Sequence, residues 1–239
     1  MRQPFRKALA ERNSGKALIF DSGPIISLVM NNCGWILRPL SKRYNGNFYI
    51  TREVQNELID KPLNSKRFKF EAMYIKEFLD SGSLKLIDDN ADVETNRLLR
   101  LANSIFRADK EDLRIIQRGE IESLAFLKKM HADGLVVDER TLRMLIEEPL
   151  QLRKLLTKKL YKNVTIDRSN LRQFQKLIGD VKIIRSSELC VIAFELGLMD
   201  KYADGSKREL LDGLLWGVKL RGCSISNKEI ERVIKLEGY

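Results

Sequence analysis

The chain contains short, mostly apolar runs that alternate with longer amphipathic segments, and this pattern limits its fold more than any other feature. The clearest runs cover 17–20, 48–50, 135–137 and 181–184. Short runs of this kind are typical of strands that helices bury on both faces, as in a parallel sheet. The alternation therefore predicts an α/β protein with a mainly parallel central sheet.

Between these runs the sequence favours helices with recognisable first turns. Pro24 suits the first turn of a helix that begins at Ile25, and Thr51 is expected to cap a helix over 52–59. A further helix is expected over 120–130. The last helix should begin with a capping box formed by Ser226 and Glu229.

Two long stretches near 62–115 and 141–180 are mostly helical in pattern, with weaker strand candidates at 84–87 and 164–166. No linker rich in Gly, Ser or Pro separates them from the rest of the chain. We therefore expect one domain over 1–239 with these stretches as helical insertions, preceded by a basic arm over 1–16.

The 43 basic and 33 acidic side chains give a net charge of +10, which favours a polyanionic partner, although such a charge also promotes solubility. The excess is concentrated in the second insertion. Its candidate nucleic-acid-binding residues are Lys154, Lys158, Lys159, Lys162, Arg168 and Arg172. Tyr161 and Phe174 lie among them, either to stack on bases or, more commonly at helical spacing, to fill a core.

Three cysteines without a CxxC pair argue against a disulfide framework and a zinc knuckle. The sequence shows no secretory signal and no apolar run long enough to span a bilayer. These features predict a cytoplasmic protein that does not enter membranes.

Acidic residues follow the strands where a parallel sheet binds its ligands, at the carboxyl ends. Asp21 follows the run 17–20 and Asp138 follows 135–137, whereas Glu57 lies on the helix after 48–50. Glu120 and Glu122 lie in the first turn of the helix before Asp138, and only one of them can face a given direction because they are about 200° apart.

Converging carboxylates need a counter-charge, since two of them about 5 Å apart repel by roughly 3 kcal/mol at an effective dielectric of 20. Oxygen-only ligands suit Mg²⁺ or Mn²⁺, as one or two ions that activate water against a phosphodiester. Taken singly, however, each aspartate is better explained as a helix cap and each glutamate as a solvated charge, and only their combination on alternating elements favours a metal site.

Four segments together resemble the PIN-domain nuclease family. They are Leu-Ile-Phe-Asp-Ser-Gly-Pro-Ile-Ile-Ser-Leu at 18–28, Tyr-Ile-Thr-Arg-Glu-Val-Gln-Asn-Glu-Leu at 49–58, Gly-Glu-Ile-Glu-Ser-Leu-Ala at 119–125 and Leu-Val-Val-Asp-Glu-Arg at 135–140. The strand and turn at 181–189 and the segment 207–226 are similar to the closing elements of one branch of the family. The insertions lie outside the resemblance.

The resemblance implies a three-layer α/β/α sandwich and a Mg²⁺- or Mn²⁺-dependent endoribonuclease that cuts single-stranded or structured RNA. By motif position, Asp21, Glu57, Glu120 and Asp138 match the catalytic metal acids. Glu122 is the alternative third ligand, and a glutamate there departs from the more common aspartate. Ser22 and Ser186 match hydroxyl positions near the site, and Arg140 is a candidate phosphate contact.

The family also implies partners: RNA, a second copy of the chain in a homodimer, and either a protein antitoxin or an RNA-processing partner. The large insertions favour a processing role over a compact toxin. An Asp after the first strand is also typical of haloacid dehalogenase phosphotransferases, but their mechanism needs a second Asp at position 23, which is Gly. The remaining alternative is a non-catalytic nucleic-acid-binding protein that keeps the sheet with a degenerate site.

Overall fold

The structure is a computed structural model that describes residues 16–239. The predicted basic arm over 1–16 therefore lies, except for Lys16, outside the described residues. The α/β class and the parallel central sheet are confirmed. In the described part of the chain no helix is long and apolar enough to cross a membrane.

The central sheet has five strands in the order β3-β2-β1-β6-β8, and every neighbouring pair is parallel. The strands are β1 (Lys16–Phe20), β2 (Gly46–Ile50), β3 (Lys85–Leu86), β6 (Gly134–Val136) and β8 (Ile183–Ile184). Each lies within one or two residues of a predicted run. Phe20 at the end of β1 is in register with Ile50 of β2 and Val136 of β6.

The strand order contains a switch point between β1 and β6. The chain builds outward from β1 to β2 and β3, and then crosses to the opposite side of β1 to add β6 and β8. Loops after the two strands at such a point diverge to opposite faces, which leaves a crevice at their carboxyl ends. Asp21 and Asp138 follow these two strands.

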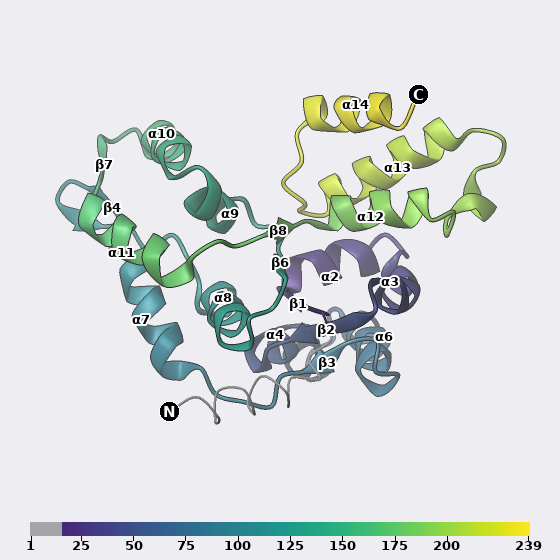
Figure 1. The fold of residues 1–239 in the computed structure, drawn as a ribbon, viewed down its shortest axis with the longest axis horizontal. Coiled ribbons are helices and arrows are strands. Elements are labelled where there is room, and N and C mark those ends of the chain that lie inside the picture. Colours follow the sequence, from purple (N-terminus) through teal and green to yellow (C-terminus); the bar gives the residue numbers. More distant parts are fainter. Residues whose placement is uncertain (1–15) are drawn as a thin grey trace, which may run out of the picture.

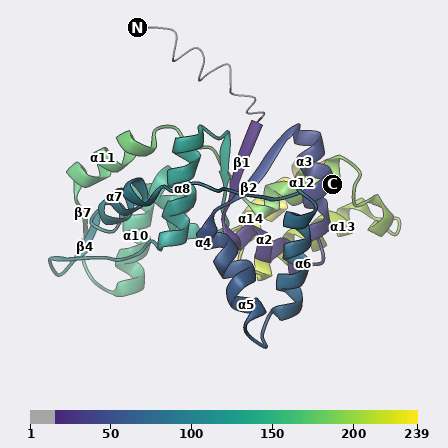
Figure 2. The same ribbon diagram turned by 90° about the horizontal axis from the view of Figure 1, so that it is seen from below.

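Apolar side chains alternate along the strands and pack into a separate core cluster on each face. Leu18, Phe20 and Val136 enter one cluster, whereas Ile19 and Leu135 enter the other. Figures 1 and 2 show the corresponding helices on opposite sides of the sheet. On the first side lie α2 (Ser22–Val29), η1 (Gly34–Ile36), α3 (Leu37–Tyr44), α6 (Lys69–Asp80), α12 (Ser186–Glu195), η3 (Asp200–Tyr202), α13 (Lys207–Leu220) and α14 (Asn227–Leu236); on the second lie α7 (Asp92–Ala102), α8 (Arg118–Met130), α9 (Arg140–Glu147), α10 (Pro149–Leu160) and α11 (Arg168–Ile178).

A second, antiparallel sheet joins the two predicted insertions. It has the order β5-β4-β7 and consists of β4 (Phe106–Ala108), β5 (Glu111–Asp112) and β7 (Val164–Ile166). Only β7 was expected from the sequence. The segments 62–115 and 141–180 are therefore not simply helical: the first contributes β3 to the central sheet, and both contribute strands to the second sheet.

Helix starts follow the predicted capping chemistry. Ser226 Oγ accepts from the Glu229 amide at 3.2 Å, and Glu229 Oε2 accepts from the Ser226 amide at 2.8 Å, which completes the capping box of α14. Thr51 Oγ1 accepts from the Val54 amide at 3.3 Å and caps α4 (Arg52–Gln55). The expected single helix over 52–59 is instead divided into α4, a π-helical turn η2 (Asn56–Asp60) and α5 (Lys61–Leu63).

Candidate functional site

A cleft of ≈ 680 Å³ opens at the carboxyl ends of β1 and β6, at the switch point of the sheet. Its walls come from the first turn of α2, from α4 and η2, from the start of α8 and from the turn after α13. It is lined by Asp21, Ser22, Gly23, Ile26, Ser27, Glu53, Glu57, Lys61, Gln117, Arg118, Gly119, Glu120, Asp138, Glu139, Arg221 and Gly222.

The cleft brings together the four acids that the sequence placed on separate elements: Asp21, Glu57, Glu120 and Asp138. Ser22 also lines it. Gly23 separates the two aspartates, since a Cβ at this position would lie 3.5 Å from Asp138 Cβ and 3.7 Å from Asp21 Oδ2.

Asp21 occupies the N-cap position of α2 but makes no capping hydrogen bond with its side chain. It is only 7% exposed. Burial raises its pKa from 3.8 to about 6, with repulsion from Glu57 and Asp138 adding to the rise and the amides of Ser22 and Gly23 opposing it. The explanation of Asp21 as a mere helix cap is therefore not supported by its contacts.

Asp138 is 2% exposed and accepts three hydrogen bonds. The hydroxyls of Ser27 and Ser186 both donate to Oδ2 at 2.7 Å, and the Ser186 amide donates to Oδ1 at 2.8 Å. Ser186 itself is fully buried behind the cleft. Sequence reasoning identified Ser186 but missed Ser27, because Ser27 and Asp138 are 111 residues apart in the sequence.

Glu57 lies on the π-helical turn η2, so its side chain points in a different direction from the one it would take in a continuous α-helix. π-helical turns are rare and occur frequently at functional sites. The Glu57 side chain is exposed and projects into the cleft opening, with Glu53 one turn earlier on the same wall.

The structure separates Glu120 from Glu122. Glu120 lines the cleft, where burial first, and then repulsion from Glu139, Asp21 and Glu57, raises its pKa to about 8. One of its oxygens accepts from the Gln117 amide at 2.7 Å. Glu122 does not line the cleft, and its Oε2 accepts from the amide of Glu53 at 3.2 Å. Glu122 therefore supports the wall that carries Glu53 and Glu57.

Several lining residues were not identified from the sequence. Glu53 and Glu139 add two carboxylates, although Glu139 also caps α9 by accepting from the Leu142 amide at 2.7 Å. Arg118 and Arg221 are basic residues at the rim, the first held by Asp92. Arg140, by contrast, is exposed and does not line the cleft, so its predicted contact with phosphate finds no support here.

The electrostatics of the cleft are dominated by uncompensated acids. Within residues 16–239, no Lys or Arg forms an ion pair with Asp21, Glu57, Glu120 or Asp138, and Lys61 reaches only Glu53 at 4.0 Å. The donor atoms are all oxygens, as Mg²⁺ and Mn²⁺ prefer. In the same part of the chain, however, no group of three or more His, Cys, Asp or Glu side chains is close enough together to hold a metal ion.

The predicted nucleic-acid-binding residues are all exposed, on α10, in the turn between α10 and β7, and on α11. Lys162 pairs with Asp109 at 2.6 Å, whereas Arg168 and Arg172 line a shallow cleft of ≈ 540 Å³ together with Arg153. Phe174 is fully buried in the core and cannot stack on a base. Tyr161 is 94% exposed.

Comparisons with known proteins add no assignment. No family model matches the chain, and no curated protein or solved structure is significantly similar to it.

Proposed function

We propose that this chain is a divalent-metal-dependent endoribonuclease with a PIN-like, three-layer α/β/α fold. The observation that carries the proposal is the convergence of Asp21, Glu57, Glu120 and Asp138 on one cleft, where none of them forms an ion pair with a basic residue of 16–239. Two apolar clusters on opposite faces of the sheet support the layered fold. Each of the four segments that resemble the PIN family supplies one of these four acids.

The side chains fit a hard divalent cation by their donor chemistry. Asp21, Glu57, Glu120 and Asp138 would hold Mg²⁺ or Mn²⁺. When bound, such an ion lowers the pKa of a coordinated water and stabilises negative charge on phosphate. Burial, with a smaller effect from neighbouring acids, raises the pKa values of Asp21 and Glu120, and a bound cation would offset both effects.

The other residues of the cleft would bind and orient the substrate. Ser27 and Ser186 fix the carboxylate of Asp138, so that its orientation does not depend on the ligand. Arg221 is exposed at the rim and is suited to contact a phosphate of the RNA backbone. An RNA-processing role, rather than a compact toxin, follows from the large segments added to the central sheet.

The second candidate is a nucleic-acid-binding protein without catalysis. Two observations favour it: three hydrogen bonds occupy Asp138, and no three acids among the described residues are close enough to chelate a metal. In this case the acidic cleft would be a remnant of a nuclease site, and RNA binding would rest on the basic surfaces alone.

A manganese-dependent RNA cleavage assay separates these candidates. We expect the wild-type protein to cut a mixed-sequence single-stranded RNA with Mn²⁺ and not with EDTA. Asp21→Asn should lower the rate at least about 100-fold, since even outer-shell changes at metal sites cost 10–100-fold. Glu231→Gln, at an exposed position on α14, is the matched control and should cut normally. Absence of cleavage with any divalent metal, or equal rates in Asp21→Asn and wild type, would support the second candidate.

A further inference from the structure

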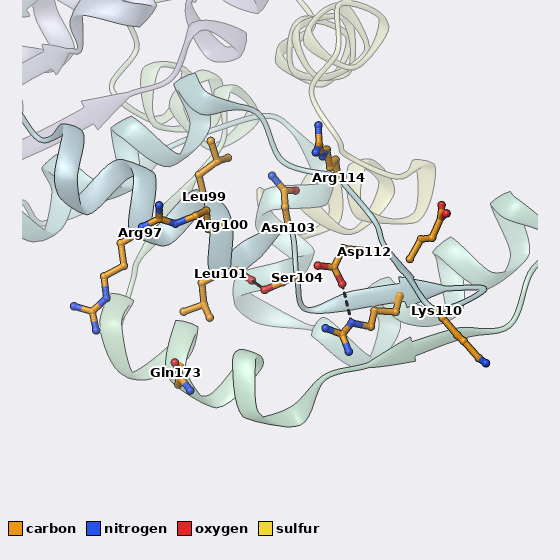
Figure 3. Close-up of a pocket in the computed structure, with 12 residues that line it drawn as sticks. Arg97, Leu99, Arg100, Leu101, Asn103, Ser104, Lys110, Asp112, Arg114 and Gln173 are labelled. Atoms are coloured by element: carbon orange, nitrogen blue, oxygen red, sulfur yellow. Dashed lines mark hydrogen bonds and ion pairs between the residues drawn. The ribbon is translucent and has the colours of Figure 1, made fainter.

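A cleft of ≈ 1110 Å³ is separate from the carboxylate cleft and is rich in basic residues. It lies between α7, the β4–β5 hairpin and the chain that follows β5. Figure 3 shows Arg97 and Arg100 on one side of it, Lys110 and Arg114 on the other, and Asn103 and Ser104 between them. The basic residues that line it are Arg97, Arg100, Arg107, Lys110 and Arg114.

Only part of this positive charge is compensated. Arg107 donates to Asp112 at 2.7 Å and lies 3.9 Å from Asp167, so its charge is balanced within the second sheet. Arg97, Arg100 and Arg114 are exposed and form no ion pair with any residue of 16–239, and Glu111 is the other acid of the lining. The groove therefore carries a net positive charge.

This charge has no evident structural role. Arg97 and Arg100 are three residues apart on α7, where like charges destabilise a helix by about 0.2–0.5 kcal/mol. Both side chains are exposed and line the groove together with the polar residues Asn103 and Ser104. An arrangement that costs stability and is open to solvent is suited to an anionic ligand.

The floor of the groove is rigid and continuous with the wall of the carboxylate cleft. Asn103 fixes the chain after β5: its Oδ1 accepts from the amides of Ile115 and Ile116 at 2.8 and 2.9 Å, and its Nδ2 donates to Ile116 O at 3.0 Å. The next residue, Gln117, already lines the carboxylate cleft. Because Arg114 and Gln117 are three residues apart, their Cα atoms lie within about 11 Å.

Helix α7 is also fastened to that wall. Arg118, which lines the carboxylate cleft, donates to Asn96 Oδ1 at 2.7 Å and pairs with Asp92, both on α7. The helix that carries Arg97 and Arg100 is thus held in a fixed position next to the acids. The two clefts form neighbouring parts of one surface.

We propose that this basic groove binds the phosphate backbone of an RNA strand whose continuing segment enters the carboxylate cleft. Among the described residues no aromatic side chain lines the groove, so its contacts are with phosphates and carry no sequence preference. The choice of RNA rests on the proposed function, but the groove as a phosphate-binding surface does not depend on catalysis.

The test is the salt dependence of RNA binding, measured by fluorescence anisotropy with a labelled single-stranded RNA in EDTA. The variant combines Arg97→Gln, Arg100→Gln and Arg114→Gln. The control combines Lys228→Gln, Arg232→Gln and Lys235→Gln, which lowers the net charge equally at exposed positions on α14. Three lost phosphate contacts should reduce the slope of log K against log salt by about 2, since each contact to a single strand contributes about 0.7. Affinity at low salt should fall at least about 10-fold.

The control should keep the wild-type slope. A double variant, Arg97→Gln with Arg100→Gln, relieves the repulsion on α7 and should fold at least as well as wild type, so it provides the same test at a slope change of about 1.4. Equal slopes for groove and control variants, or no RNA binding by wild type, would overturn the proposal.

The outcome is distinguishable from failure of the nuclease assignment. Loss of binding in the groove variant together with no metal-dependent cleavage by wild type would keep the groove and reject catalysis. Normal binding by the groove variant together with Asp21-dependent cleavage would reject the groove and keep catalysis. A second comparison combines Lys154→Gln, Lys158→Gln and Lys159→Gln. If this variant, and not the groove variant, changes the slope, the RNA binds to the surface of α10 and the proposed groove is wrong.

Discussion

Asp21 is a buried carboxylate that the protein leaves without a cation. Its pKa of about 6 means that ionising it in the folded state costs more than in the unfolded chain, where the value is 3.8. A position that destabilises the fold at neutral pH is expected where a ligand, rather than the protein, supplies the compensating charge. The buried carboxylate of Asp21, with its raised pKa, therefore indicates that the cleft is a binding site.

Asp21→Asn is therefore predicted to stabilise the metal-free protein above pH 6. The sign follows from proton binding: between pH 3.8 and 6 the folded state holds the proton that the unfolded chain has lost, so wild-type stability falls as pH rises through this range. An asparagine at this position does not ionise, so the variant does not lose stability in this pH range. Its free energy of unfolding should be up to about 3 kcal/mol higher than that of wild type at pH 8. Near pH 3 the difference should vanish. Urea unfolding in EDTA at both pH values measures it, and a variant that is less stable at pH 8 would contradict the account.

At the scale of elements, one arginine fastens the C-terminal helices to the site. Arg185, which precedes α12, donates to Ser224 O at 3.0 Å, to Glu229 Oε1 at 2.9 Å and to Glu188 Oε1 through Nε at 3.0 Å. The Ser224 amide in turn donates to the backbone oxygen of Asp138 at 3.2 Å. The loop between α13 and α14 thus supports the strand end that carries Asp138.

Arg185→Gln is predicted to lower the free energy of unfolding by about 1–3 kcal/mol at pH 7, because it leaves charged partners without their donor. Arg232→Gln on α14 is the control and should change stability little. A loss no larger than that of the control would show that this network does not hold the helices.

The stability that this network contributes depends on pH. Burial alone would raise the pKa of Glu229, but hydrogen bonds from Ser226 and the Arg185 cation outweigh it and lower this pKa to about 2. The contribution of Glu229 is therefore present above pH 4.5 and is lost as the pH falls towards 2. In Arg185→Gln this loss should be smaller, which acid titrations of both proteins, followed by circular dichroism, would show. A steeper loss in the variant would contradict the assignment.

Elements with a local signal were predictable from the sequence, and elements that depend on distant contacts were not. The strands β1, β2 and β6 are short apolar runs, and Ser226 and Glu229 carry the cap of α14 within four residues. In contrast, β4 and β5 contain charged residues and are strands because β4 pairs with β7, with Arg107 opposite Thr165. The π-helical turn at Glu57 likewise had no signal in the apolar pattern.

The candidate site was predictable to the same extent. Two aspartates after two strands of a parallel sheet must meet if those strands are neighbours, and β1 and β6 are neighbours. The sequence did not determine whether Glu120 or Glu122 faces the cleft, since that depends on the position of α4, whose Glu53 amide binds Glu122. It also did not identify Ser27 as a partner of Asp138, because that contact spans two distant elements.

At the scale of the whole molecule, the charge of +10 is unevenly arranged. Among the described residues, Asp21, Glu57, Glu120 and Asp138 at the switch point of the sheet form no ion pair, while the groove on α7 and the β4–β5 hairpin is basic. A basic surface attracts a polyanion, and an acidic cleft next to it can bind a cation that contacts the bound polyanion. The residues that line the groove belong to the segments 62–115 and 141–180 that are added to the central sheet.

The most direct measurement is the thermal unfolding of the protein as Mn²⁺ is added, compared between wild type, Asp21→Asn and Glu231→Gln at pH 7.5. A cation that binds only the folded cleft adds about 2.7 kcal/mol at a concentration 100 times its dissociation constant. The account predicts that Tm rises with Mn²⁺ in wild type and in Glu231→Gln, and stays constant in Asp21→Asn. An unchanged Tm in wild type, or an equal rise in Asp21→Asn, would contradict a metal site formed by these carboxylates.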